Sequence, residues 1–87
     1  MSADNNRQRV CSHVARVLRE KREKRGLSMR ELASKAGLSQ AMISFVEREL
    51  RKPTLDTLLR ITHVLDVDLA DVLREAQETT ASKYESK

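Results

Sequence analysis

The amino-acid sequence predicts an all-α fold of five helices, and three features of the chain favour this class. Alanine, leucine, lysine, arginine and glutamate, which are strong helix formers, dominate the composition. Residues that break helices are scarce, with two glycines and one proline among 87 residues. Serine, threonine or aspartate stands before several segments of apolar periodicity, where each can act as a helix N-cap. This length suits one small domain.

The first helix is expected to begin near Arg7, because Val10, Val14, Val17 and Leu18 fall on one helical face. Gly26 ends it. Residues 1–8 are polar and predict a flexible N-terminus, and residues 9–78 are expected to form the folded domain. Residues 79–87 have no apolar periodicity, so a flexible tail is expected there.

Two short helices are expected between Ser28 and Glu47. Ser28 and Glu31 have the spacing of a capping box, in which side chain and backbone of both residues bond reciprocally. Gly37 can adopt the left-handed conformation that ends the first of the two helices. Ser39 caps the second helix, which carries Ile43 and Val46 inward.

The last two helices are expected at residues 55–65 and from residue 69 to about residue 78. Thr54 and Asp68 are placed as their N-caps. Asp66 follows the first of these helices and tolerates the left-handed conformation of a helix end better than most residues.

Two short helices joined at a glycine are the helix-turn-helix arrangement. The stretch resembles the helix-turn-helix of the phage repressor and Cro (XRE) family, and the likeness extends from about Val14 to Leu73. The resemblance implies a five-helix, lambda-repressor-like domain that binds specific duplex DNA sequences as a homodimeric transcriptional regulator. Its recognition helix would be residues 39–48, in the major groove. The residues that match the family register are Leu32, Ala33, Ala36, Gly37, Ser39, Ile43, Ser44 and Glu47.

The family usually has glycine where Glu49 stands. The recognition helix is therefore expected either to extend by a turn or to leave Glu49 in a less favourable backbone conformation.

The resemblance places Gln40, Ala41, Ser44 and Phe45 on the side of the recognition helix that faces DNA bases. Gln40 can bond an adenine edge with both of its amide atoms. Ala41 and Phe45 can pack on thymine methyl groups, and Ser44 can donate or accept with little selectivity. The alternative for Phe45 is a core aromatic side chain.

Phosphate contacts are expected around the recognition helix, from backbone amides at the helix starts and from basic side chains. In the family a glutamine often stands where Met29 does, and a thioether cannot replace its hydrogen bonds. The expected phosphate-contacting residues are Ser28, Met29, Arg30, Ser39, Arg48, Arg51 and Lys52.

Arg22 and Glu47 match a family ion pair that ties the first helix to the recognition helix.

The last two helices are rich in large aliphatic residues, which predicts a homodimer interface. Ile61, Val64, Leu69 and Val72 are the expected interface residues. The alternative is that these side chains simply wrap the core of one chain.

A formal net charge of +4 and a pI near 9.6 favour a polyanionic partner without identifying it. An enzyme is not expected, because His13 and His63 lie far apart in the sequence and no phosphate loop or nucleophile motif is present. Cys11 is interpreted as a small apolar residue that is buried or half-buried.

No cofactor, metal or small-molecule ligand is expected, and no apolar stretch is long enough to span a membrane. A cytoplasmic protein is the simplest interpretation. The competing function is a protein-interaction module such as the antitoxin of a toxin–antitoxin pair. An RNA-binding role is disfavoured, since the chain has no aromatic stacking platform.

Overall fold

The computed structural model describes residues 3–85 of the chain, and side chains between residues 6 and 78. It contains five helices and, within the described residues, no strand, so the all-α prediction is confirmed. The helices are α1 (Ala3–Lys24), α2 (Met29–Ala36), α3 (Gln40–Glu47), α4 (Leu55–Leu65) and α5 (Leu69–Glu85).

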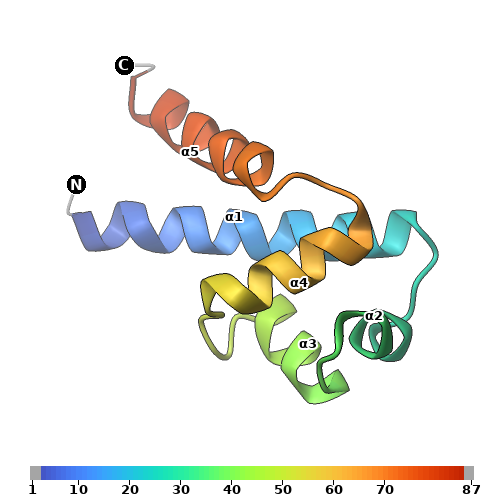
Figure 1. Ribbon diagram of the computed structural model, residues 1–87. Coiled ribbons are helices and arrows are strands. Elements are labelled where there is room, and N and C mark those ends of the chain that lie inside the picture. The colour runs from blue at the N-terminus through green and yellow to red at the C-terminus, as the bar shows by residue number, and fades with distance from the viewer. Residues whose placement is uncertain (1–2, 86–87) are drawn as a thin grey trace.

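Helix α1 is the scaffold of the fold, since it packs against α3, α4 and α5 (Figure 1). Helix α2 packs against α3 and α4, and these two short helices lie on the opposite side of α1 from α5. The start of α1 and the end of α5 lie at the same end of the molecule. The two short helices are therefore held at a distance from both chain ends.

One hydrophobic core joins all five helices. Leu18 of α1, Leu32 of α2 and Ile43 of α3 are almost completely buried in it. Ile61 and Leu65 of α4 are equally buried, and α5 adds Val72 and Ala76. Because each helix supplies only a few apolar side chains, the core depends on every helix being present.

Four helices end in the same way, with a residue in the left-handed conformation. These residues are Gly26, Gly37, Glu49 and Asp66, with φ values between 58° and 71°. After α3, the amide of Glu49 donates to Val46 and the amide of Leu50 donates to Phe45, which is a Schellman motif. The second alternative for Glu49 is therefore the observed one, and α3 does not extend by a turn.

Both terminal helices are longer than the apolar periodicity indicates. Helix α1 begins at Ala3 rather than near Arg7, and α5 continues to Glu85 rather than ending near residue 78. Neither added segment contains glycine or proline, so no local signal stops the helix. The flexibility of residues 1–8 and 79–87 stays a prediction, and residues 1–2 and 86–87 lie outside the described residues.

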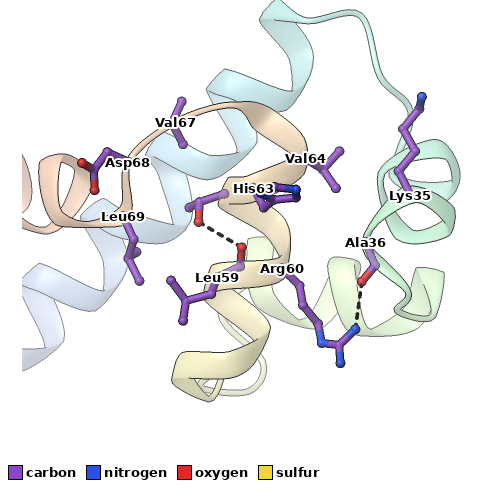
Figure 2. Close-up of a pocket in the computed structure, with 10 residues that line it drawn as sticks. Lys35, Ala36, Leu59, Arg60, His63, Val64, Val67, Asp68 and Leu69 are labelled. Carbon is purple, nitrogen blue, oxygen red and sulfur yellow. Dashed lines mark hydrogen bonds between the residues drawn. The ribbon is translucent and has the colours of Figure 1, made fainter.

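Three of the four residues expected at a dimer interface are instead part of the single-chain core. Ile61, Leu69 and Val72 are buried in one chain, with exposed fractions of 2%, 7% and 3%. The expectation that they lack a place in one small core is wrong, because α5 folds back along α1 and α4, which buries Ile61 of α4 and Leu69 and Val72 of α5 between the helices. Val64 is half-buried and lines a hollow between the end of α2, α4 and the start of α5 (Figure 2).

Candidate nucleic-acid interface

The second helix of the helix-turn-helix presents its N-terminus at the surface. Ser39 caps α3, because its hydroxyl accepts a hydrogen bond of 3.0 Å from the Met42 amide. Ile43 and Val46 fix the opposite face in the core, with exposed fractions of 0% and 3%. Within the described residues the amides of Gln40 and Ala41 have no recorded hydrogen bond, as is usual for the first amides of a helix, so two backbone donors are left at the helix start.

The four residues expected to face DNA bases lie together on α3. Gln40 and Ala41 are exposed, whereas Ser44 and Phe45 are half-exposed. They occupy positions one, two, five and six of an eight-residue helix, which places them on one side of it. The structure therefore brings together a polar amide, a methyl group, a hydroxyl and an aromatic ring in one accessible strip.

Phe45 does not belong to the hydrophobic core. Its ring is half-exposed, and the guanidinium carbon of Arg51 lies 4.6 Å from the ring centre. A cation over an aromatic face is attracted by the negative charge of that face. This contact holds Arg51, a residue of the loop between α3 and α4, beside the exposed strip of α3. No short sequence pattern indicates this pairing, since the partners are six positions apart in the sequence and lie on either side of a helix end.

The basic residues expected to contact phosphates are accessible. Arg30, Arg48, Arg51 and Lys52 are all exposed. For Arg30, Arg48 and Lys52 the structure records no side-chain hydrogen bond or ion pair within its described residues. Arg48, Arg51 and Lys52 lie in or next to the α3–α4 loop, so their charges are accessible to an anion beside the exposed strip of α3.

The start of α2 is partly occupied by its own capping box. The Glu31 amide donates to the Ser28 hydroxyl at 3.0 Å, and the Ser28 amide donates to the Glu31 carboxylate at 2.8 Å. Hydrogen bonds from Ser28 to the Glu31 carboxylate lower the pKa of Glu31 below its ordinary value of 4.5, and the bond from the Ser28 backbone amide is the largest cause. The Ser28 amide is thus not available to a phosphate, and the Ser28 side chain also interacts with Glu31.

Met29 cannot use its side chain as a phosphate contact. The thioether packs against the hydrophobic core and is half-buried there. Among the residues that the structure describes, the backbone amides of Met29 and Arg30 have no recorded acceptor at the start of α2. Any phosphate contact at Met29 would therefore come from its backbone.

Arg22 and Glu47 lie in direct contact, as the resemblance implies. The Nε atom of Arg22 donates to Oε2 of Glu47 at 2.7 Å, and Nη2 donates to Oε1 at 3.0 Å. Arg22 also donates to the backbone oxygen of Leu27 at 2.8 Å. The hydrogen bonds with Glu47 raise the pKa of the Arg22 guanidinium above its ordinary value. One guanidinium thus connects α1, the turn before α2 and the end of α3.

Two further contacts, which the sequence did not indicate, brace the region. Arg25 donates to the backbone oxygen of Leu65 at 3.0 Å and joins the end of α1 to the end of α4. Ser12 donates to the Glu49 carboxylate at 2.6 Å, which attaches α1 to the loop after α3. Long-range bonds of this kind have no periodicity, so only the three-dimensional structure shows them.

Nothing among the described residues forms a metal-binding group of histidine, cysteine, aspartate or glutamate side chains. Over the same part of the chain, each helix is too short or too polar to cross a bilayer.

Comparison with known proteins finds one family model in this chain. The model, described as a helix-turn-helix, matches residues 18–72, which include α2, α3 and α4. The match therefore covers the exposed strip of α3 and the α3–α4 loop.

The chain is also similar to named transcriptional regulators. It is 34% identical over 67 residues to the HTH-type transcriptional regulator SinR of Bacillus licheniformis, an alignment that covers 76% of this chain and 60% of SinR. The chain thus matches about three fifths of that relative's length.

Two solved structures have the same fold. The clp gene regulator ClgR from Corynebacterium glutamicum superimposes with a TM-score of 0.74 at 29% identity, over 86% of this chain and 80% of ClgR. The complex of SinR with SinI gives a TM-score of 0.68 at 34% identity, over 83% of this chain and 71% of the matched chain.

Proposed function

The chain belongs to the XRE-type helix-turn-helix family, and the relative SinR is named as a transcriptional regulator; we propose that this chain binds specific duplex DNA sequences as a homodimer. It acts in the cytoplasm, as a regulator without catalytic activity. The observation that carries the proposal is the exposed strip of Gln40, Ala41, Ser44 and Phe45 at the capped start of α3. A strip of this chemistry matches the edges that bases offer in the major groove.

Sequence selection starts with Gln40, whose amide suits the paired donor and acceptor of adenine. Ala41 and Phe45 supply apolar surface for thymine methyl groups, and Ser44 adds a less selective hydrogen bond. These contacts need α3 to lie at a fixed depth in the groove. The accessible donors around α3 would hold the helix at that depth by contacting phosphates on both sides of the groove.

The angle of α3 is set by the ion pair between Arg22 and Glu47. Glu47 is the last residue of α3, so a two-bond contact there restrains the helix at the end far from Gln40. A guanidinium and a carboxylate joined by two parallel bonds fix orientation as well as distance. We assign the pair a positioning role rather than a contact with DNA.

The homodimer is best supported by the outward face of α4. Leu55 and Leu59 lie one turn apart there, with exposed fractions of 64% and 49%. Val64 and Val67 are half-buried and, with Leu59, line the hollow shown in Figure 2. Covering this apolar surface with a second copy would remove it from water. A two-fold axis would then place two recognition helices about 34 Å apart, one turn of DNA.

The proposed function is tested by selecting bound sequences from a pool of random duplex DNA with the purified protein. We expect enrichment of a rough palindrome whose half-sites are centred about 10 base pairs apart. Recovery of no common sequence, with equal affinity for selected and unselected duplexes, would overturn the sequence-specific function.

A further inference from the structure

A second hollow lies behind the α3–α4 loop, away from the face of α4 described above. Its volume is about 230 Å³, and α1, the end of α3, the loop, α4 and α5 all contribute to its wall. Protein cores normally leave few spaces larger than a water molecule. This hollow is many times larger than the space that one water molecule needs, so it is large enough to hold a small ligand. Its apolar wall consists mainly of Val10, Val14, Ala15, Val46, Leu58 and Leu73.

The rim of this hollow is positively charged. Arg51 and Lys52 line it together with one acidic residue, Glu49. The Glu49 carboxylate already accepts the 2.6 Å hydrogen bond from Ser12, whereas Lys52 has no recorded partner among the described residues. A ligand that enters here thus meets an apolar wall and two cationic side chains against one carboxylate, so the charged part of the lining remains positive on balance.

From this arrangement we propose that the hollow binds a small aliphatic carboxylate, with the tail among the apolar side chains and the carboxylate at Lys52 and Arg51. Burial of the tail supplies affinity in proportion to the apolar area removed from water. The charged rim selects an anionic head group. The volume is below the roughly 300–1,000 Å³ of sites for drug-sized ligands, so a short or medium unbranched chain fits better than a bulky one.

Occupancy of this site would weaken DNA binding. Lys52 and Arg51 are proposed phosphate contacts, and a carboxylate held between them neutralises charge that DNA would otherwise meet. This consequence rests on the proposed function, whereas the ligand site itself does not. The carboxylate would thus act as an effector of DNA binding.

Cys11 is a direct reporter of occupancy, because it is the only cysteine of the chain and it lines the hollow. The test measures the rate at which N-ethylmaleimide alkylates Cys11, by intact mass, with octanoate present or absent. At about ten times the dissociation constant we expect alkylation to slow about tenfold, since mass action leaves roughly one molecule in ten unoccupied. Octanol, which has the same tail without the charge, should protect much less.

A filled hollow should abolish the effect. Ala15→Leu adds three carbon atoms to the wall, and we expect octanoate to lose its protection of Cys11 in this variant. Ala70→Leu makes the same change at an exposed position of α5 outside the hollow, and it should behave as wild type. If Ala15→Leu does not fold, as judged by circular dichroism, Val10→Leu fills the hollow from a half-buried position.

Each result decides a separate point. Unchanged alkylation with octanoate, or equal protection by octanol, would overturn the proposed carboxylate site. Protection that persists in a folded, filled variant would also overturn it. Protection of Cys11 with no loss of affinity for a selected duplex would support the site and overturn its coupling to DNA. Because the alkylation assay contains no DNA, a failure of the proposed function leaves it fully interpretable.

Discussion

Arg22 and Glu47 form a two-bond ion pair that joins the scaffold helix α1 to the last residue of α3, with N–O distances of 2.7 and 3.0 Å. Their side chains are only 9% and 3% exposed. The pair is therefore shielded from solvent and from screening by salt. Its position makes the direction of the proposed recognition helix depend on α1, to which α5 is also anchored.

Replacing Glu47 by glutamine should destabilise the protein by about 3 kcal/mol, because the Arg22 charge is then buried without a counter-charge. DNA affinity should fall as well, since α3 loses its restraint. The measurement is urea unfolding combined with a binding titration.

The double variant Arg22→Met with Glu47→Leu separates charge from packing. It should recover much of the lost stability, because apolar residues of similar size often replace a buried pair at little cost. Unfolding of Glu47→Gln at the wild-type urea concentration would show that the ion pair does not support the fold.

Salt dependence should report the phosphate contacts of the α3–α4 loop. Replacing Lys52 by alanine should weaken all duplexes alike and reduce the slope of log affinity against log salt by about 0.9, the value for one phosphate. Arg74→Ala is the matched control, since it removes the same charge from an exposed position of α5. Equal slopes for Lys52→Ala and wild type would exclude Lys52 from the contact.

Acid should expose the contribution of the capping box. The pKa of Glu31 is lowered in the folded state, chiefly by the hydrogen bond from the Ser28 amide. A lowered pKa means that the carboxylate stabilises the fold above its ordinary value of 4.5, and that this stabilisation disappears as the pH falls through the folded-state pKa. The melting-temperature difference between wild type and Glu31→Gln should therefore shrink below about pH 4.5.

The control for this titration is Glu20→Gln, because Glu20 is an exposed carboxyl of α1 with no recorded side-chain hydrogen bond in the described part of the chain. Subtracting the Glu20→Gln difference removes the effect of losing one exposed carboxyl from the helix surface. A Glu31→Gln difference that is constant from neutral pH to about pH 3 would show that the capping carboxylate contributes nothing as an anion.

A charge on the outward face of α4 should separate the proposed dimer. Leu59→Glu is expected to sediment as a folded monomer at protein concentrations at which the wild type is dimeric, because a carboxylate would be buried against the second copy. Leu50→Glu places the same charge on another exposed leucine, in the α3–α4 loop, and should remain dimeric. Wild-type protein that is monomeric throughout the micromolar range would overturn the dimer.

Local signals in the sequence predicted most of the fold correctly. The capping box of Ser28 and Glu31, the N-caps Ser39 and Thr54, and the left-handed Gly37 and Asp66 are all as expected. Each of these features depends on residues within one helical turn, so a short pattern specifies it. The same reasoning left Glu49 undecided, because a non-glycine residue adopts φ = 61° only where the surrounding structure stabilises it.

Long-range packing was less predictable. Ile61, Leu69 and Val72 were expected at an interface because a helical wheel shows how many apolar side chains a helix has, and not what covers them. The return of α5 along α1 decides their burial. The contact of Arg51 with Phe45 and the hollow beside Cys11 likewise depend on how the loop is seated.

The proposed contact of Gln40 with an adenine in the major groove determines how α3 docks on DNA. It is tested most directly by replacing each adenine of the selected duplex, one at a time, with 7-deazaadenine, which lacks the N7 acceptor. Binding is then measured for wild type and Gln40→Ala. At one position in each half-site, the replacement should cost the wild type about 1–3 kcal/mol and cost Gln40→Ala almost nothing, because the contact is already lost. Additive losses at every adenine would show that Gln40 does not read a base and would contradict the proposed docking of α3.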